Sequence, residues 1–230
     1  FAELVEPGQA HEGIPQDQDA PGITHTDKAA GDGAMDGEGI FHVAIIFILT
    51  NYCFDIISAP DTNFKRNGQD MNTSSHPVAL VTGASSGIGY ASALALAKAG
   101  YRVFGTSRKP MATPPRGVTM LVADVTDDGS VDRLIADVMA AAGRIDLLVN
   151  NASTISLTDT TQTPMKRYDL MNQVNARGTY LCTQACLAEL VKSAAAGRGA
   201  HVLNMSPPLS MKTQWFEHHT AYTMAKYGMS

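Results

Sequence analysis

Short apolar runs alternate with longer amphipathic stretches from residue 77 to the end of the chain. The runs 78–82, 101–106, 118–123, 145–149 and 200–205 predict buried strands, because glycine or polar residues flank them. The stretches 87–99, 130–142 and 170–193 carry apolar residues at helical spacing, and another helix is expected from Thr220 to the last residue. This alternation predicts an α/β fold with a doubly wound parallel sheet.

Three residues mark the expected helix ends. Gly100 and Gly143 follow the first and second helices, where a residue without Cβ readily adopts the left-handed conformation that ends a helix. Ser130 is placed to cap the start of the second helix.

The first 70 residues differ in character from the rest. Residues 1–39 are rich in Gly, Pro, Asp, Glu, Gln and His, a composition that buries too little apolar surface to offset chain entropy. An apolar island at 40–57 and a polar stretch at 60–75 follow, and Met71 resembles a natural chain start. We therefore expect an N-terminal extension of low order over 1–70, without a catalytic role, and one globular domain over 71–230.

Charge and apolar content exclude several functions. The net charge of −5 comes without a basic stripe, so no nucleic-acid partner is expected. The apolar run 40–49 is shorter than the about 20 residues that span a bilayer, and acidic residues precede it where a signal peptide would be positive. Cys182 and Cys186 lack a second Cys/His pair at ligand spacing, which favours buried thiols and no metal. A reducing, cytoplasmic location is the default.

A glycine-rich turn joins the first strand to the first helix. In the sequence TGASSGIG, residues 82–89, the glycines let the backbone turn tightly and approach a pyrophosphate. Free N–H groups at the helix start, together with the helix dipole, favour the negative charge.

The spacing TGxxxGxG resembles the signature of the short-chain dehydrogenase/reductase family, whose fold is Rossmann-like. Further family motifs follow in order, namely Asp124-Val125, Asn150-Asn151-Ala152, Asn175, Ser206, and the Tyr222/Lys226 pair of YxxxK. The resemblance covers 78–230. It implies a nicotinamide cofactor and a small-molecule carbonyl or alcohol substrate. The cofactor-binding residues expected from the motifs are Gly83, Ser85, Ser86, Gly87, Ile88, Gly89, Ser107, Arg108, Lys109, Asp124, Val125, Asn151, Ala152, Tyr222 and Lys226.

The residues after the second strand favour NADP(H) over NAD(H). No carboxylate stands there to accept bonds from ribose hydroxyls, and Arg108 and Lys109 could pair with a 2′-phosphate. Thr106 and Ser107 could add hydroxyl contacts.

The catalytic candidates are Tyr222, Lys226, Ser206 and Asn175. Tyr222 and Lys226 share one helix face, where the ammonium is expected to lower the pKa of the phenol. By resemblance, Ser206 orients the substrate oxygen and Asn175 holds a water in a proton relay. Ser210 is the alternative serine, because Ser206 lies farther from Tyr222 than the family's serine does. The segment 207–220 is expected to line an apolar substrate pocket.

Residues 150–230 resemble one subgroup, the hydroxysteroid dehydrogenase-like proteins, although Ser153 replaces the usual glycine of NNAG. The family continues beyond the YxxxK helix with further strands, so we expect a C-terminally truncated fold whose last strand lacks a neighbour. A homo-oligomer paired through the long helix is implied. A non-catalytic nucleotide-binding or interaction protein remains the alternative function.

Overall fold

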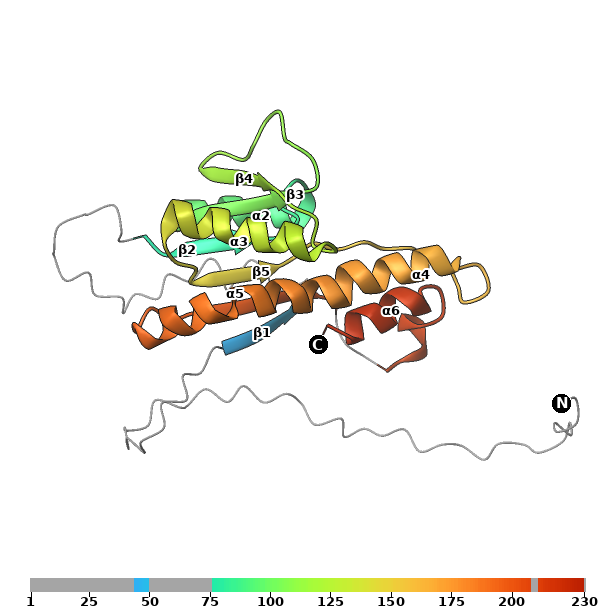
Figure 1. The fold of residues 1–230 in the computed structure, drawn as a ribbon. Helices are drawn as coiled ribbons and strands as arrows, with labels where there is room; N and C mark the ends of the chain where they lie inside the picture. Colours follow the sequence, from blue (N-terminus) through green and yellow to red (C-terminus); the bar gives the residue numbers. More distant parts are fainter. Residues whose placement is uncertain (1–43, 50–75, 208–210, 230) are drawn as a thin grey trace, which may run out of the picture. The chain divides into compact units, whose positions relative to one another are not determined.

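The computed structural model describes residues 44–49, 76–207 and 211–229. Its centre is a six-stranded parallel sheet with the order β1-β6-β5-β2-β3-β4 (Figure 1). The strands are β1 (Ala44–Leu49), β2 (Val78–Val81), β3 (Arg102–Ser107), β4 (Val118–Val122), β5 (Leu147–Asn150) and β6 (His201–Ser206). All five strands expected from the sequence are present, and the doubly wound α/β fold is confirmed.

The helices connect these strands and cover both faces of the sheet (Figure 1). They are α2 (Gly87–Lys98), α3 (Asp128–Ala142), α4 (Met165–Met171), α5 (Gly178–Ala195) and α6 (Thr220–Tyr227). A π-helical segment, Asn172–Arg177, joins α4 to α5, so the single helix expected over 170–193 has three parts. The last helix ends at Tyr227 rather than at the final residue.

Strand β2 shows how the alternation of side chains builds two cores. Val78 and Leu80 face the core beneath α3 and α5, whereas Ala79 and Val81 face the core beneath α2. Both faces are therefore apolar, as a strand buried on two sides requires. Cys182 and Cys186 lie in the first of these cores, which confirms that they are buried thiols.

The helix ends match the sequence only in part. Gly143 ends α3 in the left-handed conformation, with φ 70°. The cap at the start of α3 is Asp127, whose carboxylate accepts from the Ser130 amide at 2.5 Å. Ser130 instead accepts from the Asp124 amide through its hydroxyl at 3.0 Å. The prediction of Ser130 as cap is wrong, because α3 begins two residues before it, at Asp128, and Asp127 takes the capping position.

Buried Asp146 ties the amino ends of the strands together. Its Oδ2 accepts from the Val78 amide at 2.7 Å, and its Oδ1 accepts from Arg144 Nη2 at 2.7 Å. The Ser193 hydroxyl of α5 also donates to Oδ1. One carboxylate thus joins β2, the entry to β5 and the end of α5.

Strand β1 comes from the range 1–70, for which low order was expected. Residues 44–49 pair in parallel with His201–Ser206, so the expectation does not hold for these six residues. Their sequence, AIIFIL, favours a strand. Pairing with β1 gives β6, the last strand, the neighbour that it was expected to lack. The rest of the range 1–70 lies outside the described residues.

Candidate active site

The predicted motifs meet at one edge of the sheet. The glycine turn follows β2, Asn151 follows β5, and Ser206 ends β6. Because these strands are parallel neighbours, their carboxyl ends lie side by side. This is the edge at which open α/β sheets bind their ligands.

Two glycines of the turn are required by backbone conformation or packing. Gly83 has φ 67°, which side-chain-bearing residues rarely adopt, and a Cβ there would lie 2.8 Å from the Ala152 Cα. A Cβ on Gly89 would clash with the Asn151 amide nitrogen and the Gly83 carbonyl oxygen. The turn therefore packs directly against the segment that follows β5.

Hydroxyl and amide side chains hold the turn in place. The Thr82 hydroxyl accepts from the amides of Asn151 and Ala152, both at 3.0 Å. Asn151 Nδ2 donates to the carbonyls of Thr82 and Gly83, also at 3.0 Å. These two side chains fix the geometry of the turn. A threonine beside a glycine turn and an asparagine at a strand end were the available sequence signals.

Thr106 has a different role from the one expected. It is 1% exposed, and its hydroxyl accepts from the Gly83 amide at 3.1 Å. The expectation that Thr106 contacts a 2′-phosphate is therefore wrong, because the end of β3 places its hydroxyl against the Gly83 amide of the glycine turn. Ser107 donates to the Lys109 carbonyl, which holds the loop after β3.

The outer side of the turn is open. Ser85, Ser86, Gly87 and Ile88 are exposed, and a Cβ on Gly87 would meet no atom within 4 Å. Ser86 precedes α2 without making a side-chain cap bond. The amides at the start of this 12-residue helix thus face space in which a phosphate can sit.

A cavity of about 750 Å³ adjoins the turn and is lined by basic residues of the loop after β3. Its lining is Ser85, Ser107, Arg108, Lys109, Pro110, Met111, Ala112 and Thr113. Arg108 and Lys109 are both exposed there. The cavity therefore combines the end of the glycine turn with two positive charges.

Asp124 and Val125 flank this region after β4. Hydrogen bonds from the Thr126 amide and hydroxyl lower the pKa of Asp124, and the charge of Arg108 lowers it further. The Val125 side chain is 7% exposed and packs closely against Gly178 of α5. The side chain therefore belongs to the core, and the expected contact of Val125 with a cofactor stays a prediction.

Tyr222 and Lys226 lie on α6, with Nζ 5.8 Å from the centre of the phenol ring. Lys226 is 3% exposed, and Nζ donates to the Met205 carbonyl at 3.0 Å. Burial lowers the pKa of Lys226 to about 8. Burial also raises the pKa of Tyr222, while a hydrogen bond from Ser153 lowers it. The pKa of Tyr222 is therefore raised and not lowered as expected, because desolvation is the largest effect.

Ser206 is buried behind the tyrosine helix. Its residue exposure is 2%, and its hydroxyl has no hydrogen-bond partner within the described part of the chain. A buried hydroxyl without a hydrogen-bond partner costs folding free energy. A ligand oxygen that bonds this hydroxyl would satisfy it. Ser210 lies outside the described residues, and the choice between the two serines stays a prediction.

Asn175 is fully buried in the π-helical segment. Its Oδ1 accepts from the Thr154 amide and the Ser153 hydroxyl, both at 3.0 Å, and its Nδ2 donates to the Thr154 carbonyl at 2.9 Å. The side chain therefore fixes the loop after β5. Its predicted role in holding a water is untested by these contacts.

Contacts join the glycine turn to the loop after β5 and to the π-helical segment. Gly83 packs on Ala152, and the hydroxyl of the next residue, Ser153, donates to Asn175 Oδ1 at 3.0 Å. Ser153 was not among the predicted site residues, although its departure from NNAG marked the position.

Of the segment 207–220, which is expected to line the substrate pocket, the structure describes Pro207 and residues 211–220. Phe216 stacks on Tyr227 with ring centres 6.1 Å apart, and the His219 ring lies 6.5 Å from that of Tyr222. Met211 is 78% exposed. That this segment lines an apolar substrate pocket stays a prediction.

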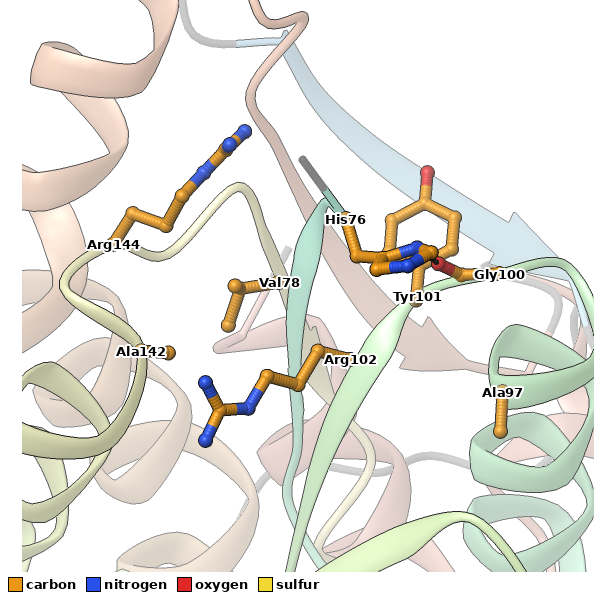
Figure 2. A pocket seen from close by; sticks show the side chains of 8 residues that line it. All are labelled: His76, Val78, Ala97, Gly100, Tyr101, Arg102, Ala142 and Arg144. Atoms are coloured by element: carbon orange, nitrogen blue, oxygen red, sulfur yellow. Dashed lines mark hydrogen bonds between the residues drawn. The ribbon is translucent and has the colours of Figure 1, made fainter. Parts of the chain in front are cut away.

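A second cavity, of about 270 Å³, lies at the amino ends of the strands, opposite the ends that carry the motifs (Figure 2). His76, Tyr101, Arg102 and Arg144 stand around it, and His76 Nδ1 bonds the Gly100 carbonyl at 3.0 Å. Arg144 is already engaged by Asp146. This cavity is separate from the strand ends that carry the motifs.

Two features of the described residues bear on other functions. Within the described ranges, no helix is long and apolar enough to cross a membrane. The same residues contain no group of three His, Cys, Asp or Glu side chains that could hold a metal ion.

Comparison with known proteins decides the family. The model for short chain dehydrogenases matches residues 77–230. The chain belongs to the short-chain dehydrogenase family. Relatives of this short-chain dehydrogenase include hydroxysteroid dehydrogenase-like protein 2 of Bos taurus, 43% identical over 167 residues, and that of Mus musculus, 44% identical. The alignments cover 66% of this chain and 39% and 33% of those relatives. The resemblance to that subgroup is confirmed.

Solved structures agree with the family. A short-chain dehydrogenase from Streptomyces avermitilis has a TM-score of 0.59 and 32% identity, covering 67% of this chain and 57% of its own. The ligand-free aldohexose dehydrogenase of Thermoplasma acidophilum has a TM-score of 0.59 and 26% identity, covering 69% and 59%. The chain thus spans about two fifths or less of its curated relatives and about three fifths of these structures.

Proposed function

We propose that this short-chain dehydrogenase interconverts a carbonyl compound and an alcohol with NADP(H), using Tyr222 as general acid and base. The observation that carries the proposal is that Lys226 Nζ, 5.8 Å from the centre of the Tyr222 ring, donates to the Met205 carbonyl near the carboxyl end of β6, on the side of the sheet that also carries the glycine turn. It brings a phosphate-binding turn and a proton donor to one edge of the sheet.

The residues present suit a dinucleotide. The exposed turn residues Ser85 to Ile88 and the amides at the start of α2 would hold the pyrophosphate. Asn151 and Thr82 keep that turn in shape, and Asp124 lies beside the region where the adenine would rest. When bound, the nicotinamide supplies or accepts the hydride.

The protein's own groups handle the proton. In reduction, the Tyr222 hydroxyl transfers its proton to the substrate oxygen, and in oxidation the phenolate takes it back. Lys226, held by the Met205 carbonyl, is positioned to favour negative charge on the phenol while it is protonated. The Ser206 hydroxyl, which has no hydrogen-bond partner in the described part of the chain, is the group proposed to orient the substrate oxygen.

Preference for NADP(H) rests on Arg108 and Lys109. Both cations border the 750 Å³ cavity at the end of the turn. Arginine offers several donors in a fixed plane and suits a phosphate. A small-molecule carbonyl or alcohol is the proposed substrate, and the exposed apolar side chains of Tyr180 and Leu187 on α5 support self-association as a homo-oligomer.

The chemistry is tested by following NADPH oxidation with a panel of ketones and aldehydes. Tyr222→Phe should lower turnover by about 10²- to 10⁴-fold, because general acid catalysis is lost. Tyr227→Phe is the matched control, since Tyr227 lies on the same helix and stacks on Phe216. Turnover that Tyr222→Phe leaves intact would refute the mechanism. Tight NADPH binding without turnover in the parent would instead favour a non-catalytic nucleotide-binding protein.

The cofactor preference has its own test. Arg108→Ala should raise the Kd for NADPH by about ten- to a hundredfold and leave NADH binding almost unchanged. Arg116→Ala is the control, because Arg116 is exposed but lies outside the lining of the cavity. Equal effects on both cofactors would argue against Arg108 as the selecting residue.

A further inference from the structure

The last two residues of β6 carry two groups of the candidate site. The Met205 carbonyl accepts from Lys226 Nζ, and the buried Ser206 hydroxyl is the group proposed to orient the substrate oxygen. Lys226 is itself buried, so its ammonium needs an oxygen partner at a fixed place. The end of β6 must therefore be held in position for both groups to act.

Strand β5 does not hold this end of β6. The register between the two strands stops at the pair Asn150 and Asn204. The next residue, Asn151, bonds the glycine turn instead, through its amide to the Thr82 hydroxyl and through Nδ2 to the carbonyls of Thr82 and Gly83. Among the described residues, β6 therefore has no strand partner on the β5 side beyond Asn204.

Strand β1 continues beside β6 to its last residue. Ile48 lies opposite Met205, and Leu49 lies opposite Ser206. In the part of the chain that the structure describes, β1 is the only strand that pairs with these two residues of β6. A ladder on one side is then what keeps their backbone extended against the gain in chain entropy on release.

We propose that Ile48 and Leu49 of β1 are positioning residues of the active site, because their main chain holds the end of β6 that carries Met205 and Ser206. The match to the family model begins at residue 77, so this strand lies outside it. The inference gives β1 a part in the site, although no catalytic role was expected for the range 1–70. Its effect on turnover rests on the proposed function, but its main readout does not.

The test places a pair of prolines at each end of β1 in the full chain. Alternate residues of an edge strand direct their N–H groups toward the neighbouring strand, so two adjacent prolines always remove one N–H from the ladder. In the end variant, Ile48→Pro/Leu49→Pro, this loss falls opposite Met205 and Ser206.

The start variant, Ala44→Pro/Ile45→Pro, is the matched control. These residues lie opposite His201 and Val202 of β6. Both of those residues also pair with β5, so their backbone keeps a ladder when β1 is disturbed. The two variants thus carry the same chemical change and differ in whether β6 has a second partner.

The main readout is the side-chain ammonium of Lys226, observed by NMR in protein labelled with ¹⁵N-lysine. Its resonance is assigned by its loss in Lys226→Arg. At pH about 6, below the pKa of about 8 that burial gives this lysine, Nζ keeps its charge. The hydrogens of a buried, hydrogen-bonded ammonium exchange slowly with water, whereas those of an exposed ammonium exchange fast and give no resolved signal. We expect the signal in the parent and the start variant, and its loss in the end variant.

Two further measurements separate positioning from general damage. Both variants should keep a cooperative thermal transition, because only an edge strand is altered. The Kd for NADPH should change by less than about twofold, since the glycine turn follows β2, which β5 separates from β6. In an active chain, kcat/KM for carbonyl reduction should fall at least about tenfold in the end variant alone.

A Lys226 signal that persists in a folded end variant overturns the inference, whatever the activity. Equal loss in both variants also overturns it, as does a parent without the signal, because the bond to Met205 is the premise. Selective loss in a chain without turnover supports the inference and counts against the proposed function alone.

A second pair of variants decides the matter if the end variant does not fold. Ile48→Gly/Leu49→Gly keeps both N–H groups but weakens the extended backbone. Exchange of the Lys226 hydrogens should be faster in this variant than in Ala44→Gly/Ile45→Gly. Equal exchange in the two glycine variants would overturn the inference.

Discussion

The Lys226 ammonium donates to the main-chain carbonyl of Met205 at 3.0 Å, and this bond joins α6 to the carboxyl end of β6. It fixes the position of a buried cation next to the phenol of Tyr222. It also gives the cation an oxygen partner in a region from which water is largely excluded.

The pH dependence of carbonyl reduction should reflect this buried lysine. Its pKa is lowered to about 8, so a rise in pH through that value removes its charge. We expect kcat/KM for reduction to fall as the pH rises past about 8, measured with saturating NADPH. In Lys226→Arg the charge persists, and any remaining activity should lack this decline. A parent profile that stays flat across the range would contradict the prediction.

Ser206→Ala should separate activity from stability. Because the buried hydroxyl has no hydrogen-bond partner among the described residues, its removal should leave the free energy of unfolding unchanged or raise it by up to about 1 kcal/mol. The kcat/KM for ketone reduction should nevertheless fall by at least about tenfold if this hydroxyl orients the substrate. Denaturant unfolding and steady-state rates provide the two readouts. Full activity in Ser206→Ala would turn attention to Ser210.

Gly89→Ala should damage the phosphate site through packing. The added Cβ would clash with Asn151 and the Gly83 carbonyl, which forces the turn to shift. We expect a loss of about 1–3 kcal/mol in unfolding free energy and weaker NADPH binding, measured by denaturation and by cofactor fluorescence. Gly129→Ala is the control, because its Cβ would come no closer than 3.4 Å to Arg133. If Gly89→Ala and Gly129→Ala had equal effects on unfolding free energy and on NADPH binding, the turn would tolerate the movement and the prediction would be wrong.

Asp146→Ala should destabilise the domain without involving the site. It removes the acceptor for the Val78 amide and for Arg144 and Ser193. The expected loss in unfolding free energy is about 3–5 kcal/mol, because a buried pair loses one member. Asp132→Ala, at an exposed position of α3, should change it by less than about 0.5 kcal/mol. A small effect of Asp146→Ala would mean that the amino ends are held by packing alone.

The fold and the order of the site motifs could be predicted from the sequence because each depends on local patterns. The glycine turn, the strand alternation and the Tyr222/Lys226 spacing are properties of short segments. The role of Thr106 could not be predicted in this way, because its hydroxyl bonds Gly83 only after β3 has paired with β2. The same holds for Ser153, whose hydroxyl donates to Asn175 in the distant π-helical segment.

The ionisation of Tyr222 was mispredicted for a related reason. Spacing along a helix shows that an ammonium and a phenol share a face, but not how much water each has lost. Burial governs both groups here, raising one pKa and lowering the other. Desolvation depends on the whole packed domain, so no short motif records it.

The pairing of β1 with β6 affects the order of assembly. Ala44 lies opposite His201 and Leu49 opposite Ser206, so the ladder joins segments from opposite ends of the sequence. Synthesis must have passed Ser206 before this ladder can close, whereas β2 to β5 can pair earlier. The backbone on which Lys226 rests would then be the last part of the sheet to be locked. Nascent chains should gain a nucleotide-binding turn before they gain a positioned lysine.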